Sequence, residues 1–239
     1  MPATKKTKPS FEPEAQATFV KWAPRSLILL LLFAVGYWLD CIKDRWYVFD
    51  PVQLNELSRA AIAAAPAPND TASMIQFIVA NLTQTYPSSQ VKINTDVNEW
   101  MFNNAGGAMG AMYLLHASIT EYLIIFGTPL GTEGHSGVHT ADDYFNILVG
   151  EQWAFAAGQL EMERYTPGMV NHLPRGIKTK QYKMHEGCFA LEYVRGWVPP
   201  MLPFGFMDTF TSTLDFFTLY RTVRITSREM VQNLLRGKI

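Results

Sequence analysis

Residues 121–127, Glu-Tyr-Leu-Ile-Ile-Phe-Gly, form the stretch that decides the fold, because a run of β-branched and aromatic side chains ends there at a glycine. Such runs favour β-strands. A turn-rich segment follows, punctuated by Gly131, Gly134 and Gly137. Further short strand candidates surround Tyr165 and cover residues 180–184 and 188–194. Short strands separated by Gly and Pro turns predict a small antiparallel barrel or jelly roll.

Two amphipathic helices are expected before the barrel. In residues 50–65 one helical face collects apolar side chains, namely Leu54, Leu57, Ala61 and Ala64. Pro66 and Pro68 break that pattern, and a second helix is predicted over residues 71–85.

An uncharged run near the N-terminus, residues 26–39 (SLILLLLFAVGYWL), predicts a membrane anchor. Residues 22–42 match the roughly 20 residues that cross a bilayer, with Arg25 and Asp40 at the two edges. Basic residues precede the run, namely Lys5, Lys6, Lys8, Lys21 and Arg25. A basic flank stays cytosolic, so the remainder of the chain is expected in the lumen of the secretory pathway.

A cleaved signal peptide is the alternative interpretation of this run. Residues 34–36, Ala-Val-Gly, fit a small-x-small cleavage site. The long basic leader, and the aromatic residues Tyr37 and Trp38 directly after the site, favour an anchor that is retained.

Composition excludes several other classes of protein. The 239 residues carry a formal net charge of −1, and their Lys and Arg side chains are spread rather than clustered, which argues against nucleic acid as a partner. Only two cysteines occur, Cys41 and Cys188, so neither a disulfide framework nor a cysteine-rich metal site is expected.

The C-terminal part changes character again. Residues 201–220 are rich in phenylalanine but are broken by Pro203 and Gly205, and residues 220–235 follow an amphipathic helical pattern. A helix pair lying on the membrane surface and a helical cap on the barrel both fit this pattern.

Glu192, within residues 188–194 (CFALEYV), is the first candidate for chemistry. Strict alternation with Phe189, Leu191 and Tyr193 favours an outward, solvated carboxylate. In the opposite orientation the carboxylate enters the barrel beside Ala190 and Val194, where loss of water would raise its pKa and suit a proton donor.

Two other motifs are weaker candidates. Asp142 and Asp143 follow a Gly-rich turn, and at most one of two adjacent strand residues can enter a pocket; a turn or helix start is the local alternative. His135 and His139 suggest a metal site that Asp142 or Glu192 would complete.

Longer strings identify a family resemblance that covers nearly everything after the leader. The chain resembles the family of fungal sterol C-8 isomerases and the animal sigma non-opioid intracellular receptor in residues 100–112, 114–118, 121–122, 126–128, 134–137, 141–145, 165–168, 202–206, 208–209 and 212–215. Residues 141–145 (ADDYF) and 202–206 (LPFGF) are similar to the fungal enzymes rather than to the receptor branch.

The resemblance implies a mainly β protein, with a cupin-like β-barrel (jelly roll), an N-terminal transmembrane helix and two C-terminal membrane-lying helices. It also implies a homotrimer in the endoplasmic reticulum membrane, with no required metal or other cofactor. We therefore expect a cytosolic basic leader (residues 1–21), an anchor (22–42), a helical segment (43–99), a ligand-binding barrel (100–196) and membrane-associated helices (197–239).

The implied activity moves a sterol ring double bond from position 8 to position 7, in sterol (ergosterol) biosynthesis. An acid protonates one alkene carbon, a carbocation forms at its neighbour, and a base removes a proton from the next carbon. An 8-ene sterol is the implied substrate, and cationic amphiphilic amines are implied inhibitors. A receptor of the sigma type, which binds ligands without catalysis, is the alternative function.

The resemblance also implies roles for individual residues of this sequence. Glu192 matches the principal pocket carboxylate, and Tyr122 matches a tyrosine that hydrogen-bonds it. A gap-free match puts Phe145 where the receptor branch has its second acid, so Asp142 or Asp143 would substitute, and we favour Asp142. The expected apolar walls are Met112, Leu114, Ile124, Phe126 and Leu202.

Overall fold

The computed structural model describes residues 13–239, in two units that are considered separately: one ends at Arg45, and the other comprises Trp46–Ile239. Three of the basic leader residues, Lys5, Lys6 and Lys8, lie outside the described residues. The expected fold class is confirmed, because a two-sheet β structure flanked by helices follows an N-terminal apolar helix.

The N-terminal unit is the long helix α1 (Pro13–Ile42), which is followed by a single turn of 3-10 helix (Lys43–Trp46). The stretch Pro24–Trp46, which begins in α1, is long and apolar enough to cross a membrane. The large apolar side chains of this stretch are exposed, including Leu27, Leu31 and Phe33. An apolar surface of this kind needs lipid or another protein to cover it.

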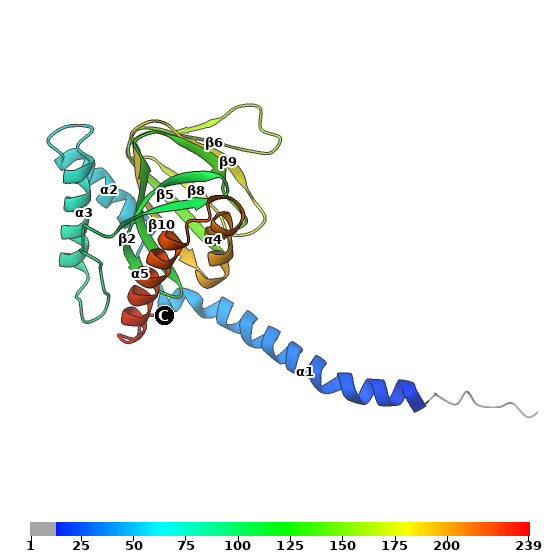
Figure 1. Ribbon diagram of the computed structural model, residues 1–239. Coiled ribbons are helices and arrows are strands. Elements are labelled where there is room, and N and C mark those ends of the chain that lie inside the picture. Colours follow the sequence, from blue (N-terminus) through cyan, green and yellow to red (C-terminus); the bar gives the residue numbers. More distant parts are fainter. Residues whose placement is uncertain (1–12) are drawn as a thin grey trace, which may run out of the picture. The chain divides into compact units, whose positions relative to one another are not determined.

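Ten strands build the C-terminal unit (Figure 1). The larger sheet has the order β1-β2-β3-β10-β5-β8 and the smaller sheet the order β4-β9-β6-β7, with every pairing antiparallel. Their bounds are β1 Trp100–Ala105, β2 Ala108–Ala117, β3 Glu121–Thr128, β4 Thr132–His135, β5 Ala141–Val149, β6 Gln152–Ala156, β7 Glu163–Tyr165, β8 Val170–Leu173, β9 Lys180–Met184 and β10 Cys188–Gly196.

Both faces of the larger sheet are covered. On the inner face, Ile124, Ala190 and Ile147 belong to a core that also contains Met184 of the smaller sheet. On the outer face, side chains such as Leu123 and Leu191 belong to a second core. Successive residues of a strand point to opposite faces, so each central strand supplies both cores.

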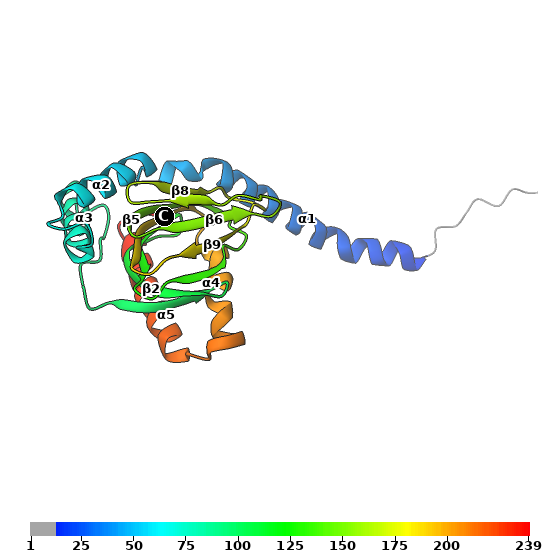
Figure 2. The same cartoon turned by 90° about the horizontal axis from the view of Figure 1, so that it is seen from above.

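Helices α2 (Pro51–Ala64) and α3 (Thr71–Thr85) cover the outer face, and Figure 2 shows them together on one side of the barrel. They begin and end within a residue or two of the predicted ranges. Asp50 starts α2 by accepting hydrogen bonds from the backbone amides of Val52 and Gln53. The apolar helix residues that are fully or almost fully buried against the sheet are Leu54, Ala61, Met74, Ile78 and Leu82.

The C-terminal helices cover a different side, against β1 and β2. A 3-10 turn (Pro199–Met201) leads into α4 (Leu202–Asp208), a π-helical turn (Thr209–Thr213) and α5 (Phe216–Leu234). On α5, Ile225 joins the inner core, whereas Phe217 and Tyr220 are exposed. The pair therefore presents one face to the barrel and a second, apolar face outward.

Glu121, the first residue of β3, is completely buried and holds distant segments together. Its carboxylate accepts hydrogen bonds from the backbone amides of Val48 (2.9 Å) and Phe49 (3.0 Å) and from the Tyr193 hydroxyl (2.5 Å). It also pairs with the buried ammonium of Lys238 at 2.8 Å. Every one of these groups loses its water on folding, so each depends on the others.

We expect Glu121→Gln to lower the free energy of unfolding by about 3–5 kcal/mol, because the buried Lys238 charge would lose its counter-charge. For a domain of this size that corresponds to a fall in melting temperature of roughly 10 °C. Thermal unfolding of the purified protein measures it. Glu133→Gln is the matched control, since Glu133 pairs with Lys183 at 3.7 Å on the exposed surface and should change the melting temperature little. Equal melting temperatures for the two variants would contradict the assignment.

Candidate functional site

A cavity lies between the two sheets and under the C-terminal helices. Its walls combine many apolar side chains with a small number of acidic and amide groups, the usual character of a small-molecule site. The larger sheet contributes Met112, Tyr122, Ile124, Phe126, Asp143, Phe145, Asn171, Glu192 and Val194. The smaller sheet contributes Gln152, Lys180 and Tyr182, and the C-terminal helices contribute Leu202, Phe204, Phe206, Thr222 and Thr226.

Glu192 projects into this cavity from β10, the strand between β3 and β5. It lies opposite Ile124 on one side and Phe145 on the other. Among the described residues, none forms a hydrogen bond or ion pair with its carboxylate. Burial, and then the nearby Asp143, raise the pKa of Glu192 well above its usual range. The inward orientation is confirmed, and burial favours the protonated form of Glu192.

Asp143 is the second acid of the cavity. On β5 it lies opposite Val194, so it is the diagonal neighbour of Glu192 on the same face of the sheet. Its Oδ1 is buried without a hydrogen-bond partner. Burial raises the pKa of Asp143 to about 6, against the opposing influence of His139 and His172. A carboxyl group with this pKa is mostly ionised at pH 7, whereas burial shifts Glu192 toward its protonated form.

Asp142, the aspartate favoured from the sequence, does not line the cavity, whereas Asp143 does. Asp142 lies on the opposite face of β5, where its Oδ1 is 3.3 Å from His172 Nε2 and accepts a hydrogen bond from the Arg175 amide at 3.2 Å. The alternative of a turn or helix start fails as well, because both aspartates lie inside a strand. Adjacent strand positions must diverge, and the pairing register fixes which one enters the cavity.

Tyr122 lines the cavity, but its expected hydrogen bond to Glu192 is not formed. Its hydroxyl lies 3.5 Å from Thr226 Oγ1 of α5. Burial is the main cause that raises the pKa of Tyr122 to about 12, and the Glu192 charge adds to it. Tyr122 therefore lies close to the carboxylate but bonds to the helix that covers the cavity.

The expected apolar wall is mostly in place. Met112, Ile124, Phe126 and Leu202 all line the cavity. Leu114 does not line it: this side chain is fully buried in the inner core behind the wall.

Tyr182 and His139 are cavity residues that the sequence analysis did not assign to the pocket. Burial, Glu192 and Asp143 together raise the pKa of Tyr182. The sequence did contain a signal for Tyr182, because alternation along β9 puts Lys180, Tyr182 and Met184 on one face. For His139, no local pattern indicates the pocket.

The two histidines of residues 135–139 bond to the backbone. His139 Nε2 lies 2.7 Å from the Ser136 carbonyl oxygen, and His135 Nδ1 accepts from the Gly137 amide at 2.8 Å. No three His, Cys, Asp or Glu side chains gather at metal-binding distance anywhere in residues 13–239. The hypothesis that joined these histidines to Asp142 or Glu192 therefore has no matching ligand set.

The chemistry open to this site is proton transfer with an apolar molecule. Two carboxyl groups with raised pKa values lie as diagonal neighbours on one face of a sheet, in a cavity with mostly apolar walls. Desolvation keeps a proton on Glu192 at a pH where an ordinary carboxyl group has lost it, and Asp143 can accept a proton or stabilise a nearby positive charge.

Comparison with known proteins identifies the family of this chain. The family model "ERG2 and Sigma1 receptor like protein" matches residues 26–238. The C-8 sterol isomerase erg2 of Aspergillus fumigatus is 59% identical over 212 residues, which cover 88% of this chain and 86% of that protein. The C-8 sterol isomerase ERG2 of Gibberella zeae is 51% identical, covering 99% and 98% of the two chains.

A more distant relative is sigma non-opioid intracellular receptor 1 of Gallus gallus, which is 37% identical and covers 82% of this chain and 83% of the receptor. Because the family model spans most of the sequence and several relatives match over nearly their whole length, the chain belongs to the ERG2 and sigma-1-receptor-like family.

Proposed function

We propose that the protein is a sterol C-8 isomerase, which moves a ring double bond from position 8 to position 7. The observation that carries this proposal is the pair of carboxyl groups, Glu192 and Asp143, that line one cavity as diagonal neighbours and whose pKa values are both raised by burial. The identity of 51–59% with named C-8 sterol isomerases supports it.

In the proposed mechanism Glu192 is the acid and Asp143 the base. Glu192 transfers its proton to ring carbon 9, and the alkene electrons form the new C–H bond, which leaves a tertiary cation at carbon 8. Asp143 then takes a proton from carbon 7, and those C–H electrons form the new double bond. The sterol gains one proton and loses one, and exchange with solvent then reprotonates Glu192 and deprotonates Asp143, so the cycle consumes nothing. The carboxylate left on Glu192 stabilises the cation while it exists.

Substrate conversion in deuterated water tests the proposal. Purified protein given an 8-ene sterol should form the 7-ene product with one deuterium at carbon 9, which mass spectrometry and NMR can locate. If the folded protein binds cationic amines but forms no 7-ene product, the proposal fails, and the receptor function takes its place.

We expect kcat/KM to fall about tenfold between pH 7 and pH 5. The base must be ionised, and a carboxyl group with a pKa of about 6 is about nine-tenths ionised at pH 7 and one-tenth ionised at pH 5. A pH–rate profile measures this acid limb, and Asp142→Asn should leave its midpoint unchanged. A flat profile down to pH 5 would exclude Asp143 as the base.

The finer location and partners are proposals as well. We propose a single-pass protein of the endoplasmic reticulum membrane, with its N-terminus cytosolic, its main domain lumenal, and three copies in the assembly. Its expected ligands are the 8-ene sterol and, as inhibitors, cationic amphiphilic amines that pair with the cavity carboxylates. The exposed apolar side chains of α1 and of the C-terminal helices, such as Phe210 and Phe217, support contact with a bilayer.

A further inference from the structure

One part of the cavity wall carries polar groups that the proton transfer does not use. Gln152 of β6, Asn171 of β8 and Lys180 of β9 all line the cavity and bond to one another. Asn171 Nδ2 donates to Gln152 Oε1 at 2.8 Å, and Lys180 Nζ donates to Asn171 Oδ1 at 3.2 Å. We call these three residues the amide cluster.

The amide cluster is held in place and electrically balanced. The Lys180 ammonium pairs with Glu163 of β7 at 2.5 Å. Gln152 and Asn171 are only 3% and 8% exposed, so their side chains have little freedom to turn toward solvent. What the cluster offers the cavity is therefore two fixed neutral amides rather than a free charge.

Two hydrogen-bonding positions of these amides remain open. Gln152 Nε2 has no hydrogen-bond partner among the described residues, although the side chain is buried and borders the cavity. Asn171 Oδ1 accepts one hydrogen bond, and a carbonyl oxygen can accept two. One donor and one acceptor are what a single hydroxyl group needs, since it accepts through oxygen and donates through hydrogen.

The position of the cluster fits the size of a sterol. Asn171 lies opposite Phe145, which lies opposite Glu192, so two strand spacings of roughly 5 Å each separate Asn171 from Glu192. In a sterol the 3-hydroxyl oxygen is five bonds from both ring carbons 7 and 9, a span of roughly 6 Å for bonds of about 1.5 Å in a zigzag. Hydrogen-bond and proton-transfer contacts at the two ends account for the remaining distance.

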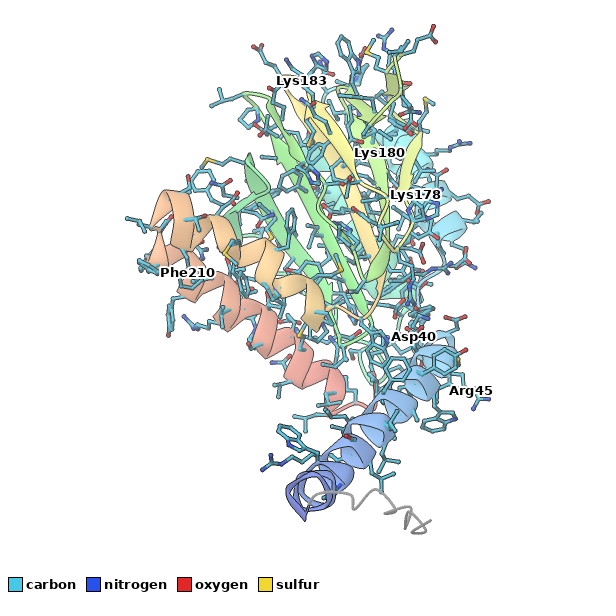
Figure 3. All side chains as sticks on the ribbon, turned by 90° about the vertical axis from the view of Figure 1, so that its right-hand side faces the viewer. Asp40, Arg45, Lys178, Lys180, Lys183 and Phe210 are labelled. Atoms are coloured by element: carbon cyan, nitrogen blue, oxygen red, sulfur yellow. The ribbon has the colours of Figure 1, made fainter. Side chains whose placement is uncertain are left out.

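A different part of the cavity wall suits the apolar end of such a molecule. Leu202, Phe204 and Phe206 of α4 line it there, and α4 lies against β1, at the edge of the larger sheet away from β8. In Figure 3, Lys180 lies among the strands while Phe210 lies on the helical side. A sterol with its hydroxyl group at β8 would therefore point its hydrocarbon tail toward the C-terminal helices.

We propose that Gln152 and Asn171, positioned by Lys180, bind the 3-hydroxyl group of the sterol. The identity of the ligand as a sterol rests on the proposed function. Anchoring the hydroxyl group fixes how far ring B lies from the two carboxyl groups, and so selects which ring carbons gain and lose a proton.

The test compares equilibrium binding of two unreactive probes, a saturated 3-hydroxy steroid and its 3-deoxy counterpart, to the purified full-length protein. Wild type should bind the hydroxy probe about tenfold more tightly. Gln152→Met, which keeps side-chain length without the donor, and Asn171→Leu should both bring this ratio close to one. Asn103→Leu is the matched control, because it removes an amide from the β1 wall of the same cavity and should keep the wild-type ratio.

The measured binding ratios either support the proposed hydroxyl site or contradict it. A wild-type ratio near one overturns the proposal without any variant, as does a tenfold ratio that survives in both cluster variants or that Asn103→Leu abolishes equally. Because the ratio compares two ligands on one protein and needs no turnover, it is independent of the proposed function. If the protein converts an 8-ene sterol but the cluster variants keep the wild-type binding ratio, only the proposed hydroxyl site is contradicted. If binding depends on the hydroxyl group but no sterol is converted, only the proposed isomerase activity is contradicted.

Discussion

Glu192→Gln should lower kcat for isomerisation of an 8-ene sterol by about 10³-fold. An alkene carbon is a very weak base, so the rate depends on a desolvated acid at contact distance, and a glutamine amide cannot donate a proton to carbon. The cation at carbon 8 would also lose the carboxylate that stabilises it. The variant keeps the size and shape of the side chain, and because Glu192 has no hydrogen-bond or ion-pair partner among the described residues, folding should be unaffected.

Product formation in deuterated water measures this loss, with melting temperature as the check on folding. The same variant should bind a cationic amphiphilic amine at least about tenfold more weakly, because a bound cation favours ionisation of Glu192 and a glutamine cannot become its counter-charge. Tyr122→Phe is the matched control, since it changes a neighbouring cavity residue that bonds to Thr226 rather than to Glu192, and should retain most of the rate. A Glu192→Gln enzyme with more than a tenth of the wild-type rate would exclude Glu192 as the acid.

The inward orientation of Glu192 was predictable only from the family resemblance. Alternation assumes that a strand has one buried and one solvated face. On that assumption the pattern predicts that the buried side chains are those of Phe189, Leu191 and Tyr193. In the structure both faces of the larger sheet are covered, because α2 and α3 bury Leu191 and Tyr193 on the outer side while the second sheet faces Glu192. Residue pattern alone cannot identify the core face of a strand that is buried twice.

More of the fold than of the site could be predicted from the sequence. Helices over residues 50–65 and 71–85 and strands at 180–184 and 188–194 follow from local periodicity and turn residues, and the structure has them. The choice between Asp142 and Asp143 depends on the register of β5 against β10, which is a long-range property. The gap-free match pointed at Phe145, which shares the inner face with Asp143 two positions away.

The buried contacts of Glu121 could not be predicted from the sequence either. Its sequence neighbours mark a strand start, and nothing local indicates that Lys238 or the amides of residues 48–49 will meet it. The amide cluster has the same character, since β6, β8 and β9 bring together three residues from separate parts of the chain. Such groups become visible only when strand order is known.

Asp143→Asn and Asp142→Asn should have very different effects on kcat. The pair is therefore the most direct test of how β5 is aligned against β10. We expect Asp143→Asn to lower kcat by about 10²- to 10³-fold, because an amide cannot accept the proton from carbon 7. It should also lower the pKa of Glu192, because the Asp143 charge contributes to raising that pKa. The alkaline limb of the pH–rate profile of the residual activity would therefore move to lower pH.

Asp142→Asn is the control that the chain itself supplies, one residue away on the same strand. Its carboxylate pairs with a half-exposed histidine at 3.3 Å on the outer surface, an interaction that contributes little to stability or to chemistry in the cavity. The rate should therefore stay within about twofold of wild type, and the pH profile should not move. The reverse result, an active Asp143→Asn enzyme and an inactive Asp142→Asn enzyme, would mean that β5 pairs with β10 in a register shifted by one residue, which would also turn Phe145 away from Glu192.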